Sequence, residues 1–157
     1  HDKDKAEMAI LKVSSFLRNT MNEQALVSLK DEIKNVGEYI ELENIRFSDR
    51  IHLEIVGELP RWSVPKFSLQ LIVENAIKHG FVSNKESLNI KLFFDMRQKI
   101  IKIENDGLAM QKKSFGVGLS NLNQRLELLC KGSLSVESLE RSMFYIHLGD
   151  CCENINS

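Results

Sequence analysis

The sequence predicts a two-layer α/β sandwich, in which a mostly antiparallel sheet is covered on one face by helices and preceded by a helical arm. Three observations lead to this fold class. Apolar residues recur at helical spacing up to about residue 46. From Arg50 onward they alternate, as in half-buried strands. From the second helix of the arm onward, the predicted order is helix, strand, helix, strand, strand, helix, strand, strand, which favours separate helical and sheet layers.

The N-terminal arm is predicted to contain two helices. The first spans 4–20 and is followed by a polar break at 19–23. The second spans about 29–46, and Ser28 is its predicted N-cap, with Asp31 three residues later in place of the usual Glu. The apolar positions of these helices are Ala6, Ala9, Ile10, Val13, Phe16 and Leu17 in the first, and Ile33, Val36, Ile40 and Leu42–Ile45 in the second.

The globular part is predicted to begin with a strand at 51–56, where Ile51, Leu53 and Ile55 alternate with more polar residues. A helix over 65–79 follows. Pro65 is expected at its first position, because proline has the φ of a helix and its missing N–H is not needed there. Gly80 is the expected stop.

The second half of the chain is predicted to supply four more strands and one helix. Alternating apolar residues at 88–94 and 101–103 indicate two of the strands. The helix, at 119–130, places Leu119, Leu122, Leu126 and Leu129 on one side, and the last two strands lie at about 134–138 and 142–148. We therefore divide the chain into an arm (1–46), a globular domain (47–150) and a tail (151–157).

The composition excludes several classes of protein. A chain of 157 residues suggests one domain that needs neither disulfides nor metal to bury a core. Its 21 basic and 22 acidic residues lack the basic excess of a nucleic-acid-binding protein. There is no run of 18 apolar residues and no signal peptide. Cys130, Cys151 and Cys152 form no CxxC pair and no zinc spacing, which favours a reduced, cytosolic setting, and we assign the last two no role.

The first chemical signal is the segment ENAIKHG at 74–80. On a helix Asn75, Lys78 and His79 share a face, because they lie three and four residues apart. An amide oxygen suits Mg²⁺, and an ammonium suits phosphate. A metal–triphosphate complex would use both. The alternative is a solvated polar face, in which Lys78 and His79 complement the negative C-terminal end of the helix.

The second and third signals lie at a strand end and at the start of a helix. Asn105 shares the parity of Ile101 and Ile103, so it points inward, whereas Asp106 points outward. An inward amide either bonds to backbone or reads a ligand, and Asn-Asp-Gly is also a good turn sequence. The segment GVGLSN at 116–121 opens a helix, where glycines and free N–H groups suit an anion, although capping glycines are common.

These segments together resemble a known family. Residues 64–80, VPKFSLQLIVENAIKHG, resemble the N box of LytS-like sensor histidine kinases, and 116–126, GVGLSNLNQRL, resemble their second glycine box. Residues 39–47, YIELENIRF, are similar to the helix that leads into the catalytic domain of that family. The resemblance covers about 10–148. It implies the Bergerat ATP-binding sandwich, which gyrase and MutL share, and thus ATP and Mg²⁺ as ligands.

The resemblance also implies roles for single residues. Asn75 matches the Mg²⁺-coordinating asparagine, and Lys78 and His79 match positions that contact the phosphates. Arg125 either reaches phosphate or forms a surface ion pair. The remaining ligand-binding positions are Gly107 in the first glycine box, and Gly116, Gly118, Leu119 and Asn121 in the second.

Three positions depart from the family pattern. Asn105 stands where the family has an adenine-reading Asp, and Ala109 replaces the second glycine of the first box. Leu71 stands where related ATPases have a Glu that acts as general base, four residues before the Asn. Glu74 is the nearest carboxylate and is included among the catalytic candidates, but its role as general base stays open.

The implied function is that of the catalytic ATP-binding domain of a bacterial two-component sensor histidine kinase. None of His1, His52, His79 and His147 matches the acceptor motif, so the acceptor histidine is expected outside this chain. The implied partners are that acceptor and dimerisation segment, a second copy in a homodimer, and the receiver domain of a response regulator. The alternatives are a non-catalytic nucleotide-binding scaffold of the same fold and another ATPase of the superfamily. The latter is disfavoured by the helical arm and by the short loop between Asp106 and Gly118, where the resemblance implies a lid over ATP.

The expected location follows from the same interpretation. The chain starts without Met in a charged segment that already has helical spacing, so we interpret it as an excised fragment. This fragment is expected in the cytoplasm. The full-length protein is expected to be anchored in the inner or plasma membrane by a segment outside the present sequence.

Overall fold

The computed structural model describes residues 2–20, 25–81, 86–107, 116–138 and 142–151. The predicted tail beyond Cys151, together with Ala109 and His1, therefore lies outside the described residues. The elements are, in chain order, α1 (Asp2–Thr20), β1 (Leu26–Ser28), α2 (Leu29–Phe47), β2 (Ile51–Val56), β3 (Ser63–Pro65), α3 (Ser68–Gly80), β4 (Leu88–Asp95), β5 (Ile100–Asn105), α4 (Val117–Cys130), β6 (Ser133–Ser138), β7 (Ser142–His147) and the 3-10 turn η1 (Gly149–Cys151).

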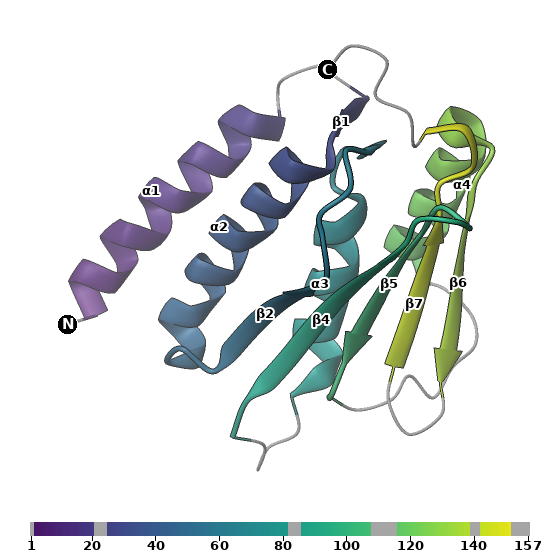
Figure 1. Cartoon of the computed structure of the whole chain (residues 1–157). Helices are drawn as coiled ribbons and strands as arrows, with labels where there is room; N and C mark the ends of the chain where they lie inside the picture. The colour runs from purple at the N-terminus through teal and green to yellow at the C-terminus, as the bar shows by residue number, and fades with distance from the viewer. Residues whose placement is uncertain (1, 21–24, 82–85, 108–115, 139–141, 152–157) are drawn as a thin grey trace.

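The predicted two-layer sandwich is confirmed. Five strands form one sheet in the order β2-β4-β5-β7-β6, with β2 and β4 parallel and every other pair antiparallel. Helices α2, α3 and α4 lie along one face of this sheet, and α1 packs on the outer side of α2 (Figure 1). The strand parity explains the arrangement, since the alternating apolar residues of β4, β5 and β7 all face the helices.

One core lies between the two layers. On β5, Ile101 and Ile103 are fully buried, and on α3 the same holds for Leu69, Ile72 and Val73. The other residues of this core with no exposed surface are Leu29, Val36, Val64, Leu88, Ile90, Leu92, Leu122, Leu126, Cys130, Phe144, Ile146 and Leu148. Because α2 contributes Leu29 and Val36 to this core, it belongs to the helical layer of the sandwich. The predicted domain boundaries stay a prediction.

The start of α2 agrees with the sequence analysis. The hydroxyl of Ser28 accepts a hydrogen bond from the backbone N–H of Asp31 at 3.1 Å, as predicted for an N-cap. Near its C-terminal end, the side-chain amide of Asn44 bonds to both backbone groups of Ile51, at 2.9 and 3.0 Å. These bonds fix the turn that leads from α2 into the first strand of the main sheet.

The prediction that Pro65 opens the third helix was wrong. Pro65 ends the short strand β3, which pairs with β1 in a small antiparallel sheet that the sequence analysis did not predict. Phe67 then adopts a left-handed conformation with φ of 69°, so α3 begins only at Ser68. Two three-residue strands carry too little periodicity to be predicted, because their pairing depends on segments that are far apart in sequence.

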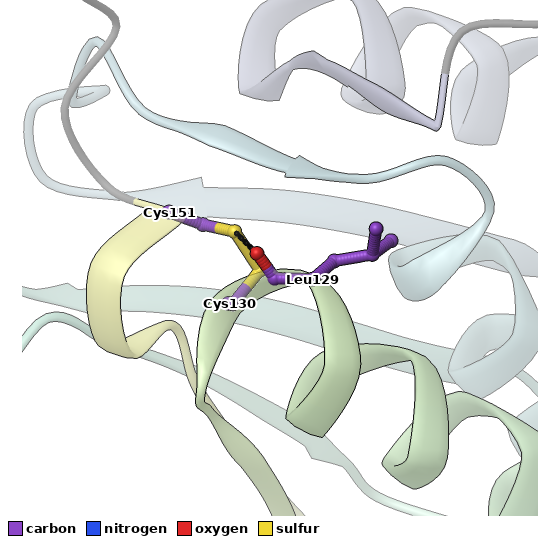
Figure 2. The surroundings of a disulfide bond; sticks show 3 residues. All are labelled: Leu129, Cys130 and Cys151. Atoms are coloured by element: carbon purple, nitrogen blue, oxygen red, sulfur yellow. Dashed lines mark hydrogen bonds between the residues drawn. A yellow bond between two sulfur atoms is a disulfide. The ribbon is translucent and has the colours of Figure 1, made fainter.

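The last helix differs from its prediction at its C-terminal end. Leu119, Leu122 and Leu126 are buried as expected, but Leu129 is 40% exposed. Cys130 takes the buried position and forms a disulfide with Cys151 (Figure 2). The interpretation of these two cysteines as reduced was therefore wrong, and Cys151, to which no role was assigned, has a structural one. The spacing of 21 residues carried no signal, because pairing depends on which chain segments meet.

Glycines permit the close approach at this disulfide. Gly149 has a φ of 55°, and a Cβ there or at Gly132 would collide with the facing backbone. The last turn of α4 and the segment after β7 therefore approach each other closely. Within the described ranges no helix is long and apolar enough to span a membrane.

Candidate nucleotide site

One wall of the candidate site is the outer face of α3. Its apolar residues turn toward the sheet, so Asn75 is left partly exposed, and Glu74, Lys78 and His79 are left exposed. All four line a cavity of about 350 Å³, together with Leu71. The structure thus brings the polar residues of the N-box-like segment to one surface, as helical spacing predicted.

The facing wall is the first turn of α4. Gly116 is the N-cap, in an extended conformation with φ of −69°, and no side chain caps this helix in the described part of the chain. Gly116, Val117, Gly118 and Leu119 line the same cavity. Helix N-termini carry unsatisfied N–H groups and a partial positive charge, so this wall is suited to an anion.

Three predicted site residues do not line this cavity among the described residues: Asn105, Gly107 and Asn121. Asn121 is exposed on α4. Asn105 is only 2% exposed and has the parity of Ile101 and Ile103, so its predicted inward orientation is observed. Its side-chain oxygen accepts a hydrogen bond from Gly107 N–H at 3.1 Å, which is the turn interaction that the sequence analysis left open.

Asp106 has a structural role on the opposite face of the sheet. Its carboxylate accepts two hydrogen bonds from Asn89, one from the backbone N–H and one from the side-chain amide, both at 2.8 Å. It also lines a cavity of about 380 Å³ with His52 and Lys91, away from α3 and α4. Asp106 therefore ties the end of β5 to the beginning of β4.

Glu32 is a buried residue that the sequence analysis missed. Its side chain has no exposed surface and accepts hydrogen bonds from the backbone N–H groups of Phe67 and Leu69, both at 3.0 Å, and of Gln70 at 3.2 Å. A carboxylate of α2 thus caps the N-terminus of α3. The available signal was its position on the buried stripe of α2, three residues after Leu29 and four before Val36.

The surroundings of Glu32 act on its acidity in opposite directions. Burial raises the pKa of the Glu32 carboxyl, whereas the three N–H donors and the charge of Arg125 oppose that rise. Arg125 is half-buried. Burial disfavours its charged form as well and so lowers the pKa of its guanidinium, while the charge of Glu32 opposes that change. Arg125 also donates a hydrogen bond to the backbone oxygen of Lys66. Arg125 does not line the cavity, and its charge acts on the buried Glu32 carboxyl, so among the described residues neither predicted alternative, a phosphate contact or a surface ion pair, is observed.

Tyr39 of α2 provides a second contact between α2 and the region of the site. It is half-buried, and burial together with the nearby carboxylates of Glu43 and Glu74 raises the pKa of its phenol above the usual range. The phenol is therefore neutral near pH 7. Its proximity to Glu74 places α2 beside the cavity-lining face of α3.

The fold is that of the histidine kinase catalytic domains. The catalytic domain of histidine kinase ThkA superposes with a TM-score of 0.57 and 17% sequence identity, over 82% of this chain and 97% of that domain. The histidine kinase AdeS of Acinetobacter baumannii gives a TM-score of 0.60 and 15% identity, over 91% of this chain and 76% of its own. At these identities the likeness shows the fold alone.

Sequence comparison leads to one group of sensor proteins. The chain is 25% identical to the sensor protein LytS of Enterococcus faecalis over 94% of its length, and 30% identical to LytS of Streptococcus agalactiae over 85%. It spans 29% and 26% of those relatives. A family model described as histidine kinase matches residues 1–51. The resemblance to LytS-like sensor histidine kinases, inferred from the motifs, is thereby confirmed.

Proposed function

We propose that this chain is the ATP-binding catalytic part of a two-component sensor histidine kinase. In this proposal it positions ATP with Mg²⁺ so that the γ-phosphate reaches a histidine outside the chain. The observation that carries the proposal is the cavity between the polar face of α3 and the first turn of α4, where no described side chain caps the helix. Its two walls correspond to the two motifs that resemble the N box and the second glycine box.

The residues around the cavity fit a magnesium–triphosphate group. Asn75 offers a neutral side-chain oxygen of the kind Mg²⁺ accepts alongside phosphate and water. Lys78 and His79 offer cationic or hydrogen-bonding groups for phosphate oxygens, and the first turn of α4 adds backbone N–H groups. The volume of about 350 Å³ lies within the range of roughly 300–1,000 Å³ that is usual for small-molecule sites.

The chain's own contribution to phosphoryl transfer would be binding and orientation. ATP would supply the phosphoryl group, and such transfers depend chiefly on position and on charge neutralisation. Glu74 lies at the cavity and is exposed, so it is available as a base, but an imidazole acceptor needs little activation near neutral pH. In the same proposal Asn105, Gly107, Gly118, Leu119 and Asn121 belong to the nucleotide-binding set.

The proposed partners lie outside the described residues. They are the acceptor and dimerisation segment of the full-length protein, a second copy of that protein, and the receiver domain of a response regulator. The proposal also includes membrane anchoring of the full-length protein by a segment outside this sequence, which covers 29% and 26% of two similar sensor proteins.

The central test is nucleotide binding with and without Mg²⁺. Asn75→Ala should remove most of the Mg²⁺-dependent gain in ATP affinity and leave the fold intact, because the side chain lines the cavity and lies outside the core. Isothermal titration calorimetry measures both affinities. Gln124→Ala removes an exposed amide of α4 away from the cavity and is the matched control. Equal Mg²⁺ dependence in Asn75→Ala and the wild-type chain would contradict the metal role.

A non-catalytic nucleotide-binding module is the second candidate. It is favoured by the neutral amide of Asn105 at the position where the family has a carboxylate. The two candidates differ when the acceptor segment is supplied as a separate protein with labelled ATP. The kinase forms acid-labile phosphohistidine on that segment, whereas the module binds ATP and transfers nothing.

A further inference from the structure

The two helices that form the cavity are joined to each other at the opposite end. Arg125 lies two turns beyond the cavity-lining start of α4 and donates to the backbone oxygen of Lys66, just before α3. The cavity-lining residues of α3, in contrast, begin at Leu71 and end at His79. The helices therefore run antiparallel, with the cavity at one end and the Arg125 contact toward the other.

The same end of α3 is held by Glu32. Phe67 has a positive φ and supplies no side-chain cap, so the first N–H groups of α3 depend on the Glu32 carboxylate of α2. Two further polar atoms here, Ser68 Oγ and Gln70 Oε1, are buried and have no hydrogen-bond partner within the described part of the chain. Glu32 thus makes three of the polar contacts that hold this end of α3.

We propose that Glu32 and Arg125 act together as a latch that sets the position of α3 relative to α4, and thereby the geometry of the nucleotide cavity. Glu32 is a positioning residue in this proposal, since it contacts the start of α3 and not the cavity. The inference rests on the proposed function, because the cavity is taken to be the nucleotide site.

The physical link is the stiffness of the helix. Asn75 lies six residues after Leu69, which is about 9 Å along the axis at a rise of 1.5 Å per residue. A change in the tilt of α3 at its capped end therefore shifts Asn75 and Lys78 relative to the N–H groups of α4. Small displacements matter at such a site, because binding groups must match ligand atoms closely.

The test uses Glu32→Gln in the whole 157-residue chain. Glutamine keeps the volume but replaces one acceptor oxygen with an NH₂ donor, so the N–H of Phe67 or those of Leu69 and Gln70 lose their partner. We expect the Kd for ATP·Mg²⁺ to rise about tenfold, a size typical of slight misplacement, at a temperature where circular dichroism shows the variant folded. Arg125→Gln is expected to have a similar effect, and the double variant less than the product of both.

Ser28→Ala is the matched control. It removes the N-cap bond of α2 and destabilises the same helix without touching α3. Its melting temperature is expected to fall while its Kd for ATP·Mg²⁺ stays at the wild-type value. An unchanged Kd in folded Glu32→Gln would overturn the latch, as would an equal loss of affinity in Ser28→Ala, which would indicate a general effect of lower stability.

Amide hydrogen exchange separates failure of the latch from failure of the proposed function. If the wild-type chain binds no ATP·Mg²⁺, the proposed function fails. The latch is then judged by exchange at residues 75–78, which should be faster in Glu32→Gln than in Ser28→Ala at matched temperatures below each midpoint. Equal protection in the two variants would refute the latch.

Discussion

The two helices at the cavity are anchored in opposite ways. Helix α3 is held at its N-terminus by the Glu32 carboxylate and lines the cavity with residues from Leu71 to His79. Helix α4 is held at its C-terminus by the disulfide of Cys130, and no side chain of the described residues caps its N-terminus at the cavity. The N-terminus of α3, which serves packing, is thus capped by a carboxylate of the protein, whereas the N-terminus of α4, which faces the cavity, has no side-chain cap in the part of the chain that the structure describes. This difference separates structural from ligand-binding uses of the same positive helix end.

The largest effect that tests this comparison is expected at the anchored end of α4. Reducing the Cys130–Cys151 disulfide should lower the free energy of unfolding by roughly 3 kcal/mol, because the bond closes a loop of about 20 residues in the unfolded chain. Urea unfolding with and without reductant measures the change. Nucleotide affinity should be unaffected, since the disulfide lies at the far end of α4 from the cavity. A reductant-dependent Kd would show that the two ends of α4 are coupled.

A carboxylate introduced at the N-terminus of α4 should cap this helix, as the Glu32 carboxylate caps α3. Gly116 has extended backbone angles, and the space that a Cβ would occupy there is open, so Gly116→Asp fits as an N-cap. Its charge should oppose phosphate by on the order of 1 kcal/mol, which weakens ATP binding about fivefold. Gly116→Asn, a neutral cap of the same shape, is the control and should weaken binding less. Titration of both variants with ATP·Mg²⁺ gives the comparison, and equal affinities would contradict an anion at this helix end.

The smallest effects concern the end of strand β5. Asn105→Asp should keep the ATP affinity or improve it by on the order of 1 kcal/mol. A charged acceptor binds the amino group of adenine more strongly than a neutral acceptor does. Asn105→Leu should lose affinity. Asp106→Ala should leave the affinity for ATP unchanged and lower the stability of the fold, because the backbone N–H of Asn89 loses its acceptor. Nucleotide titrations and thermal melts of the three variants measure these effects. Loss of ATP binding in Asp106→Ala but not in Asn105→Leu would show that Asp106, and not Asn105, contacts the adenine.

Much of the fold was predictable because its signals are local. The period of the apolar residues indicated the long helices and the strands of the main sheet, and Ser28 marked the start of α2. The inward parity of Asn105 and the shared face of Asn75, Lys78 and His79 followed from the same periods. The short strands β1 and β3 and the late start of α3 did not, since three-residue strands carry too little pattern.

The sequence by itself therefore determined which side chains each helix or strand turns inward and which it presents outward. Only the tertiary structure decided which of these side chains meet. Glu32 caps backbone groups 35 to 38 residues away, and Arg125 bonds to a carbonyl 59 residues away. Cys130 likewise finds its partner only where two segments converge. A buried charge or thiol is satisfied by whatever lies next to it in space, and spacing along the chain carries no record of that neighbour.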